Sequence, residues 1–207
     1  LPAAARAQPE LGTRPLYIPV AHRPLGREPQ VVDHIGGATS SLAAAGDVAY
    51  AATAGRLQAY RILPGADPER LALDAPTDRY VRSVTVHRGH LYASLIGVPG
   101  IEVFEIRPGG QLRPTGSVPG VADVADVTYV GDYAYACDPR GVRVLDATSP
   151  SHLRVLGGVD IERGAYGCAA TSSGVVVSRW VRNLGLSYVD ASEPTRPVVT
   201  HQLPEAY

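Results

Sequence analysis

Short runs in which apolar and polar residues alternate follow one another along most of the chain, separated by turn residues. In VRVLD (142–146), Val142, Val144 and Asp146 fall on one side of an extended chain, and Arg143 and Leu145 fall on the other. This period of two predicts β-strands. No segment has a sustained helical period, so the sequence predicts an all-β protein with very little helix.

The predicted strands recur at a nearly constant interval. A tyrosine in an apolar strand occurs at Tyr50, Tyr92 and Tyr135, and Val177 takes its place in a fourth copy, at intervals of 42, 43 and 42 residues. A glycine that opens the next strand recurs at intervals of 45, 41 and 44 residues, as Gly55, Gly100, Gly141 and Gly185. Two independent markers with the same period indicate four copies of one structural unit.

Each copy contains four predicted strands, which in the third copy span 124–130, 133–137, 142–146 and 153–156. Gly131-Asp132 predicts a tight hairpin between the first two strands, as do Gly46-Asp47 and Arg88-Gly89 in their copies. In the turns 146–150 and 190–194, an Asp carboxylate can accept backbone N–H bonds. Four antiparallel strands per unit of about 40 to 45 residues are typical of a β-propeller blade. We therefore expect blades at about 38–77, 78–120, 121–161 and 162–203.

The residues before the four copies predict an incomplete blade and a leader. PLYIPV (15–20) and PQVVDHI (29–35) resemble the two outer strands of a partial N-terminal blade over 15–37, so that 15–207 forms a single propeller domain. Residues 1–14, with small residues at Ala5 and Ala7, fit either a signal-peptide remnant or a flexible leader. Three interpretations follow. The chain is part of a longer protein with about six to eight blades, or it is a five-bladed ring with one incomplete blade, or it is a four-bladed ring with terminal additions. The first is favoured, because an unclosed ring leaves an unpaired strand edge.

Charge and hydropathy exclude two classes of partner. The formal net charge is −1 and no long run of either sign occurs, whereas a nucleic-acid binder needs a basic surface. No apolar stretch approaches the roughly 20 residues of a membrane-spanning helix. We therefore expect no nucleic acid and no direct membrane span, and we expect another protein or complex as the partner.

The third copy, GDYAYACDPRGVRVLDATSP (131–150), resembles the repeat of the LVIVD propeller family, in which a GxYAYVA strand precedes GLxVVDVSDPxxP. The fourth copy keeps GLSYVDASEPTRP (185–197), whereas the first two have lost the Asp of this motif. The resemblance covers roughly 38–201. It implies a propeller fold and an extracytoplasmic location, whether periplasmic, secreted or at the cell surface, and it implies no particular reaction.

The two cysteines of the chain fall in neighbouring copies. Cys137 ends a predicted second strand, and Cys168 lies near the start of the next first strand. In a propeller these ends lie on the same face of adjacent blades, so a disulfide between them is geometrically possible and an exported chain permits it. The alternative is two separate buried thiols that act as small apolar fillers.

No pattern of catalytic or metal-binding residues emerges from the sequence. The six histidines are scattered, without Cys or carboxylates at ligand spacing. Gly109-Gly110 and Gly157-Gly158 are interpreted as strand-to-strand turns, with no helix behind them to bind a phosphate. We therefore predict no catalytic residue, no metal site and no cofactor.

The fourth copy has a longer loop, SRWVRNLG (178–185), that contains the only Trp of the chain. Trp180 between Arg179 and Arg182 is typical of an interface hot spot, and the alternative is a lid over the core of the blade. The propeller arrangement places four further residues on the same face: Asp138, Arg140, Tyr80 and Arg82.

These features favour a non-catalytic, exported scaffold or accessory subunit of a larger assembly that binds another protein through this face. The alternative is an enzyme, or a propeller that binds a small ligand or a metal, with its site in the central channel.

Overall fold

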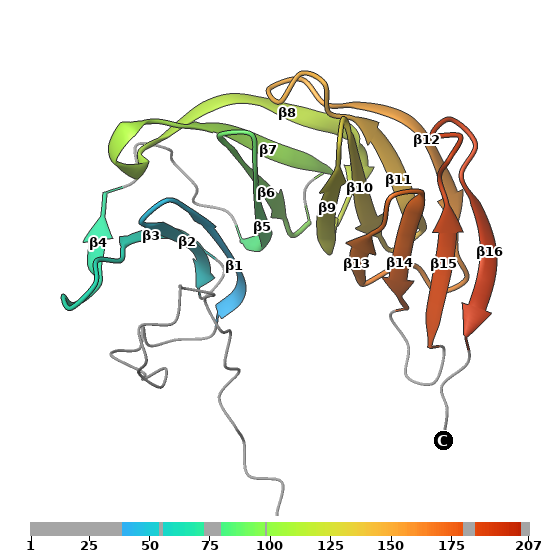
Figure 1. Cartoon of the computed structure of the whole chain (residues 1–207), viewed down its shortest axis with the longest axis horizontal. Coiled ribbons are helices and arrows are strands. Elements are labelled where there is room, and N and C mark those ends of the chain that lie inside the picture. The colour runs from blue at the N-terminus through green and yellow to red at the C-terminus, as the bar shows by residue number, and fades with distance from the viewer. Residues whose placement is uncertain (1–38, 54–55, 73–79, 98, 180–184, 204–207) are drawn as a thin grey trace, which may run out of the picture. The chain divides into compact units, whose positions relative to one another are not determined.

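Four antiparallel sheets of four strands each make up the described part of the chain (Figure 1). The computed structural model describes residues 39–53, 56–72, 80–97, 99–179 and 185–203. All of these lie in the compact unit Ile35–Tyr207. The predicted leader and partial blade therefore lie outside the described residues, and no blade before residue 39 is described.

Within each sheet the strands pair in the order in which they occur along the chain. The first sheet contains β1 (Thr39–Ala45), β2 (Val48–Thr53), β3 (Arg56–Arg61) and β4 (Glu69–Leu71), and the second contains β5 (Val81–His87), β6 (His90–Leu95), β7 (Pro99–Ile106) and β8 (Leu112–Ala122). The third contains β9 (Asp126–Val130), β10 (Tyr133–Asp138), β11 (Gly141–Asp146) and β12 (Arg154–Asp160), and the fourth contains β13 (Gly167–Ala170), β14 (Gly174–Ser178), β15 (Leu186–Asp190) and β16 (Val198–Leu203). A single 3-10 turn, η1 (Pro108–Gly110), joins β7 to β8, and the described residues contain no α-helix. The all-β prediction and the four four-stranded blades are confirmed.

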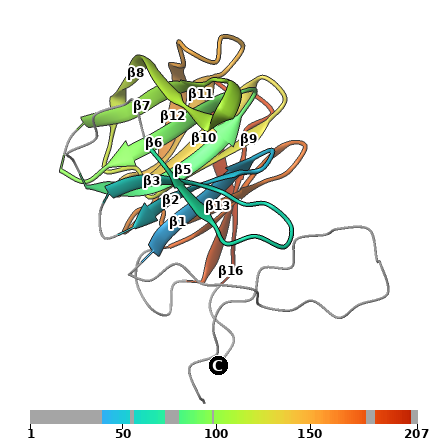
Figure 2. The ribbon, with the colours of Figure 1, turned by 90° about the vertical axis from the view of Figure 1, so that its left-hand side faces the viewer.

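The core lies between successive sheets, because alternate residues of each strand point to opposite faces. On β10, Tyr135 and Cys137 belong to the apolar cluster shared with the fourth sheet, whereas Ala134 and Ala136 belong to the cluster shared with the second. A third cluster joins the first and second sheets. Figure 2 shows β1, β2 and β3 in front of the second sheet. No apolar cluster of the described residues joins the first sheet to the fourth, so these four sheets alone do not close a ring.

Side chains connect the first strands of neighbouring sheets. The Ser41 hydroxyl accepts the Val84 N–H (3.0 Å), and the Thr85 hydroxyl donates to the Val127 carbonyl (3.2 Å). One carboxylate oxygen of Asp126 accepts the Cys168 N–H (2.9 Å). The paired residues are 43, 42 and 42 positions apart, which is the repeat period found in the sequence. These bonds hold the innermost strands side by side without backbone pairing between sheets.

In the first two blades, the repeated tyrosine joins the blade to the next. The Tyr50 hydroxyl donates to the Gly110 carbonyl (2.9 Å), in the turn between β7 and β8. The Tyr92 hydroxyl donates to the Pro150 carbonyl (2.9 Å), in the turn between β11 and β12. Both rings are buried. The tyrosine period thus reports a contact between blades as well as a strand position.

In the second and third blades, the close approach of two strands requires the repeated glycine. Gly141 has φ +148°, and a Cβ atom there would collide with the Val159 carbonyl oxygen on β12. Gly100 has φ +106°, and its Cβ would lie 3.0 Å from the Val118 carbonyl oxygen on β8. A residue with a side chain would therefore push the outermost strand away.

Candidate interaction face

The first strands begin and the second strands end at one side of the sheets. The Ile96 N–H donates to the Tyr80 carbonyl (2.9 Å) beside the start of β5, and the Tyr166 N–H donates to the Ser178 carbonyl (2.8 Å) beside the start of β13. At the other end of the strands, an ion pair between Arg88 and Asp132 (2.8 Å) joins the turns that follow β5 and β9. The first strands therefore run in the same direction, and their starts share a surface. We call this surface the loop face and define it by Tyr80, Ile96, Arg140 and Tyr166.

The loop face exposes large apolar side chains. Tyr80 is 66% exposed, Tyr166 is 54% exposed and Ile96 is 52% exposed. Tyr80 and Tyr166 each come directly before a first strand, so they occupy corresponding places in the second and fourth blades. Neighbouring exposed apolar side chains, such as Tyr80 and Ile96, are typical of an interaction site.

Asp138 ends β10 and Arg140 lies in the turn that follows, and of the two only Arg140 is exposed. Asp138 is 4% exposed, and one of its carboxylate oxygens accepts the N–H groups of Arg140 (2.7 Å) and Gly141 (2.8 Å). The other oxygen pairs with Nε of Arg143 (3.0 Å), whose guanidinium also contacts Asp160 (2.6 Å). Asp138 is thus nearly covered and each of these bonds holds the turn, so its contact with a partner stays a prediction. Asp138 is a positioning residue for the loop face.

The remaining residues predicted for this face divide into two groups. Arg82 on β5 and Arg179 after β14 are half-buried at the loop side of their sheets. Trp180 and Arg182 lie outside the described residues. Sequence reasoning did not include Ile96 and Tyr166 in the face, although the correspondence of Tyr166 with Tyr80 was a signal that could have identified it.

The two cysteines lie at the contact between the third and fourth sheets. Both are free thiols, with Cys137 buried and Cys168 half-buried. The neighbouring Cys137 thiol, and then burial, raise the pKa of the Cys168 thiol above its ordinary value. The two cysteines lie in the same apolar cluster, as the sequence predicts, and no disulfide joins them in this structure.

A stacked pair of rings lies between the second and third sheets. The ring of His87 lies parallel to that of Tyr129, with 4.2 Å between centroids. Burial, and then the positive charge of Arg88, lower the pKa of His87, while burial raises that of Tyr129. Nε2 of His87 and the Tyr129 hydroxyl are both buried without a hydrogen-bond partner. A neutral imidazole against a neutral phenol suits packing between blades.

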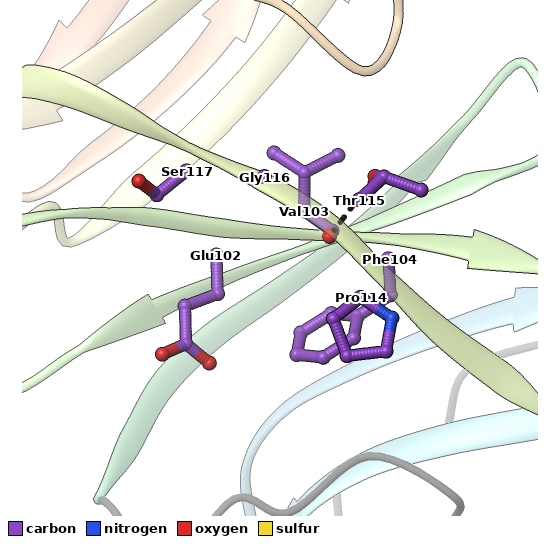
Figure 3. A pocket seen from close by; sticks show the side chains of 7 residues that line it. All are labelled: Glu102, Val103, Phe104, Pro114, Thr115, Gly116 and Ser117. Atoms are coloured by element: carbon purple, nitrogen blue, oxygen red, sulfur yellow. Dashed lines mark hydrogen bonds between the residues drawn. The ribbon is translucent and has the colours of Figure 1, made fainter.

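Two open pockets occur away from the loop face. One, of about 410 Å³, lies over β7 and β8 and is lined by Glu102, Val103, Phe104, Pro114, Thr115, Gly116 and Ser117 (Figure 3). Its polar side chains do not converge, because the Glu102 carboxylate points away from Thr115, which donates to the Val103 carbonyl (3.1 Å). The other, of about 510 Å³, is lined by strand and turn residues of the third sheet and by Ser172. In this second pocket the Thr148 hydroxyl donates to the Asp146 carboxylate (2.6 Å), a bond that fixes the turn after β11.

The described residues contain neither a metal-binding cluster nor a membrane-spanning helix. No group of three His, Cys, Asp or Glu side chains that could hold a metal ion occurs among the described residues. Within the same part of the chain, no helix has the length and hydropathy to cross a membrane.

Solved structures share this fold at low sequence identity. A functionally unknown protein from Desulfotomaculum acetoxidans aligns over 84% of this chain and 58% of its own, with a TM-score of 0.67 and 14% identity. A "putative 6-phosphogluconolactonase" from Bacteroides uniformis aligns over 80% of this chain and 55% of its own, with a TM-score of 0.67 and 16% identity. A protein from Lactobacillus plantarum aligns over 80% of this chain and 55% of its own, with a TM-score of 0.60 and 14% identity. The chain matches no protein-family model and no curated protein sequence.

These likenesses and the four stacked sheets define the class of protein: the chain has a β-propeller fold. It spans between 55 and 58% of the length of the three proteins just described. At these identities the likeness concerns the fold alone.

Proposed function

We propose that this chain is an extracytoplasmic propeller of the LVIVD-repeat kind that acts as a non-catalytic scaffold or accessory subunit. It binds another protein through the loop face. Localisation and family rest on the repeat motif, whose best copy is 131–150.

The exposure of Tyr80, Ile96 and Tyr166 on one face carries this proposal. A tyrosine ring offers a large apolar surface with few rotatable bonds, so little conformational entropy is lost when a partner covers it. Tyr80 and Tyr166 precede the edge strands β5 and β13, each of which pairs with one strand of its own sheet and is tied to a neighbouring sheet by a side-chain hydrogen bond. The Asp138 carboxylate fixes the turn between β10 and β11. The face is therefore held in place before binding, which lowers the ordering cost of association.

Co-purification tests this function. The tagged chain is expressed in its source cells, extracted from the extracytoplasmic fraction and analysed for partners present in stoichiometric amount. Replacing both Tyr80 and Tyr166 by Ala is expected to lower the amount of partner recovered with the chain at least tenfold. The melting temperature should stay within about 2 °C of the parent value, since both side chains are largely exposed.

Tyr133→Ala is the matched control, because Tyr133 is also exposed but begins β10 at the opposite side of the sheet. It should retain the partner. Equal binding by the double variant and the control would contradict the proposal. A small molecule bound stoichiometrically to the purified chain, seen by native mass spectrometry with no protein partner, would favour a ligand site in the channel instead.

A further inference from the structure

The two cysteines of this 207-residue chain lie in the same contact between blades. On β10, Cys137 shares its side of the sheet with Tyr135, and both point toward the fourth sheet. On β13, Cys168 and Ala170 point toward the third sheet. The two thiols therefore face each other across one apolar cluster.

Hydrogen bonds hold Cys168 at the level of Cys137. Asp126 on β9 is the Cα partner of Cys137 in the sheet register, and its carboxylate accepts the Cys168 N–H (2.9 Å). The Cys168 thiol lies 3.6 Å from the carbonyl oxygen of Tyr135, two residues before Cys137. The backbone of β13 is thus tied to the pair of strands that carries the other sulfur.

We propose that Cys137 and Cys168 form a disulfide that links the third blade to the fourth. The site is a covalent modification site, independent of the proposed binding of a partner. Its reagent is a disulfide oxidant of the oxidised glutathione class.

The reaction proceeds by two exchanges. One cysteine, as its thiolate, attacks a sulfur of the oxidant, whose S–S bond breaks and releases one reduced glutathione. The thiolate of the second cysteine then attacks the protein sulfur of this mixed disulfide, which forms the bond between Cys137 and Cys168 and releases the second glutathione. The two cysteines lose two protons and two electrons, and the oxidant takes them up as two thiols.

The surroundings of the pair predict when this exchange is fast. The raised pKa of the Cys168 thiol reduces its thiolate fraction in the folded, reduced protein. We therefore expect oxidation during folding to be faster than oxidation of the folded chain, and alkaline pH to accelerate the latter.

The experiment uses the full chain, refolded and also incubated folded in glutathione redox buffers. Intact mass should fall by about 2 Da, for two hydrogens, with the protein still monomeric in a non-reducing gel. Proteolysis without reductant should give one peptide pair joined through Cys137 and Cys168. The melting temperature of the oxidised form should exceed that of the reduced form by roughly 5–10 °C.

Cys137→Ser, Cys168→Ser and the double variant are the controls. Each should fold with the same circular dichroism spectrum and lose the difference between oxidising and reducing buffers. Two fully alkylatable thiols in chain refolded under oxidising conditions would overturn the proposal. So would a stable mixed disulfide with glutathione at either cysteine, because it would mean that the second sulfur is out of reach. Partner capture measured on the same samples reports separately on the loop face.

Discussion

At the scale of a residue, Tyr92 shows what the repeated tyrosine contributes. Its ring is buried among apolar residues of the second and third sheets, and its hydroxyl is the donor for the Pro150 carbonyl (2.9 Å). Pro150 is half-buried, and a carbonyl that is partly removed from water and lacks a donor is costly, so the hydroxyl contributes once the ring is in place. Val177 has no such hydroxyl at the corresponding position of the fourth blade.

Replacing Tyr92 by Phe removes the donor and leaves the Pro150 carbonyl unpaired. We expect the free energy of unfolding to fall by about 1–2 kcal/mol. Urea denaturation followed by circular dichroism measures this loss. Tyr133→Phe is the matched control and should change stability by no more than a few tenths of a kcal/mol, because Tyr133 is exposed. Equal stability of the two variants would show that the bond to Pro150 contributes nothing.

The residue patterns predict the positions of the strands well and the structural roles of the glycines less well. The first strand of the third blade begins at Asp126, not at Val124, because Asp123 adopts φ +49° and turns the chain. Gly157-Gly158 is part of β12, so its interpretation as a turn was wrong. A Cβ at Gly157 would lie 2.6 Å from the Thr195 carbonyl oxygen, and one at Gly158 would lie 2.6 Å from Nη1 of Arg143. The missing side chains at these glycines leave room for atoms of Thr195 and Arg143. A local sequence pattern does not reveal such contacts between residues distant in sequence.

At the scale of an element, the turn between β10 and β11 depends on a charge network. Arg143 is 8% exposed and pairs with the buried carboxylate of Asp138 and the exposed carboxylate of Asp160. The two carboxylates lower the free energy of a guanidinium that is largely removed from water. Of the two, Asp138 also accepts two backbone N–H groups, so it connects the turn to the strand.

Asp138→Asn should therefore destabilise far more than Asp160→Asn. We expect the first variant to lose about 3 kcal/mol, because it leaves a buried guanidinium short of its buried counter-charge. The second removes an exposed carboxylate, whose ion pair is screened by solvent, and should have a much smaller effect. Thermal and urea denaturation of both variants at the same pH measure the two losses in free energy of unfolding. Similar losses would mean that burial of the Asp138 pair is not what stabilises the turn.

The same network explains why the interaction face was only partly predictable. The sequence placed Tyr80, Arg140 and Asp138 at one end of the blades, because the repeat fixes which loops share a side. It did not separate Arg140, which is exposed, from Asp138, which is buried, since that difference arises from Arg143 on the next strand. Ile96 joins the face through its N–H bond to the Tyr80 carbonyl, a contact between segments 16 residues apart.

At the scale of the whole molecule, the four blades are held together by contacts that bury polar groups between sheets. Tyr50 is buried at the first contact and Tyr92 at the second. Burial, assisted at Tyr50 by the charge of Asp47, raises the pKa of each hydroxyl from 10.0 to about 12. Both contacts therefore require their phenol to be neutral.

This requirement predicts that the folded chain loses stability at alkaline pH. Below pH 10 the phenols are protonated in the folded and the unfolded chain, and their contribution to stability is complete. Between pH 10 and about 12 the unfolded chain loses these protons and the folded chain keeps them, so the free energy of unfolding must fall as pH rises. Urea denaturation at intervals across this range measures the slope. A variant with both Tyr50 and Tyr92 replaced by Phe should start less stable and lose stability less steeply. The cysteines and Tyr129 are common to both proteins, so a slope equal to that of the parent chain would show that the two buried hydroxyls do not control the alkaline transition.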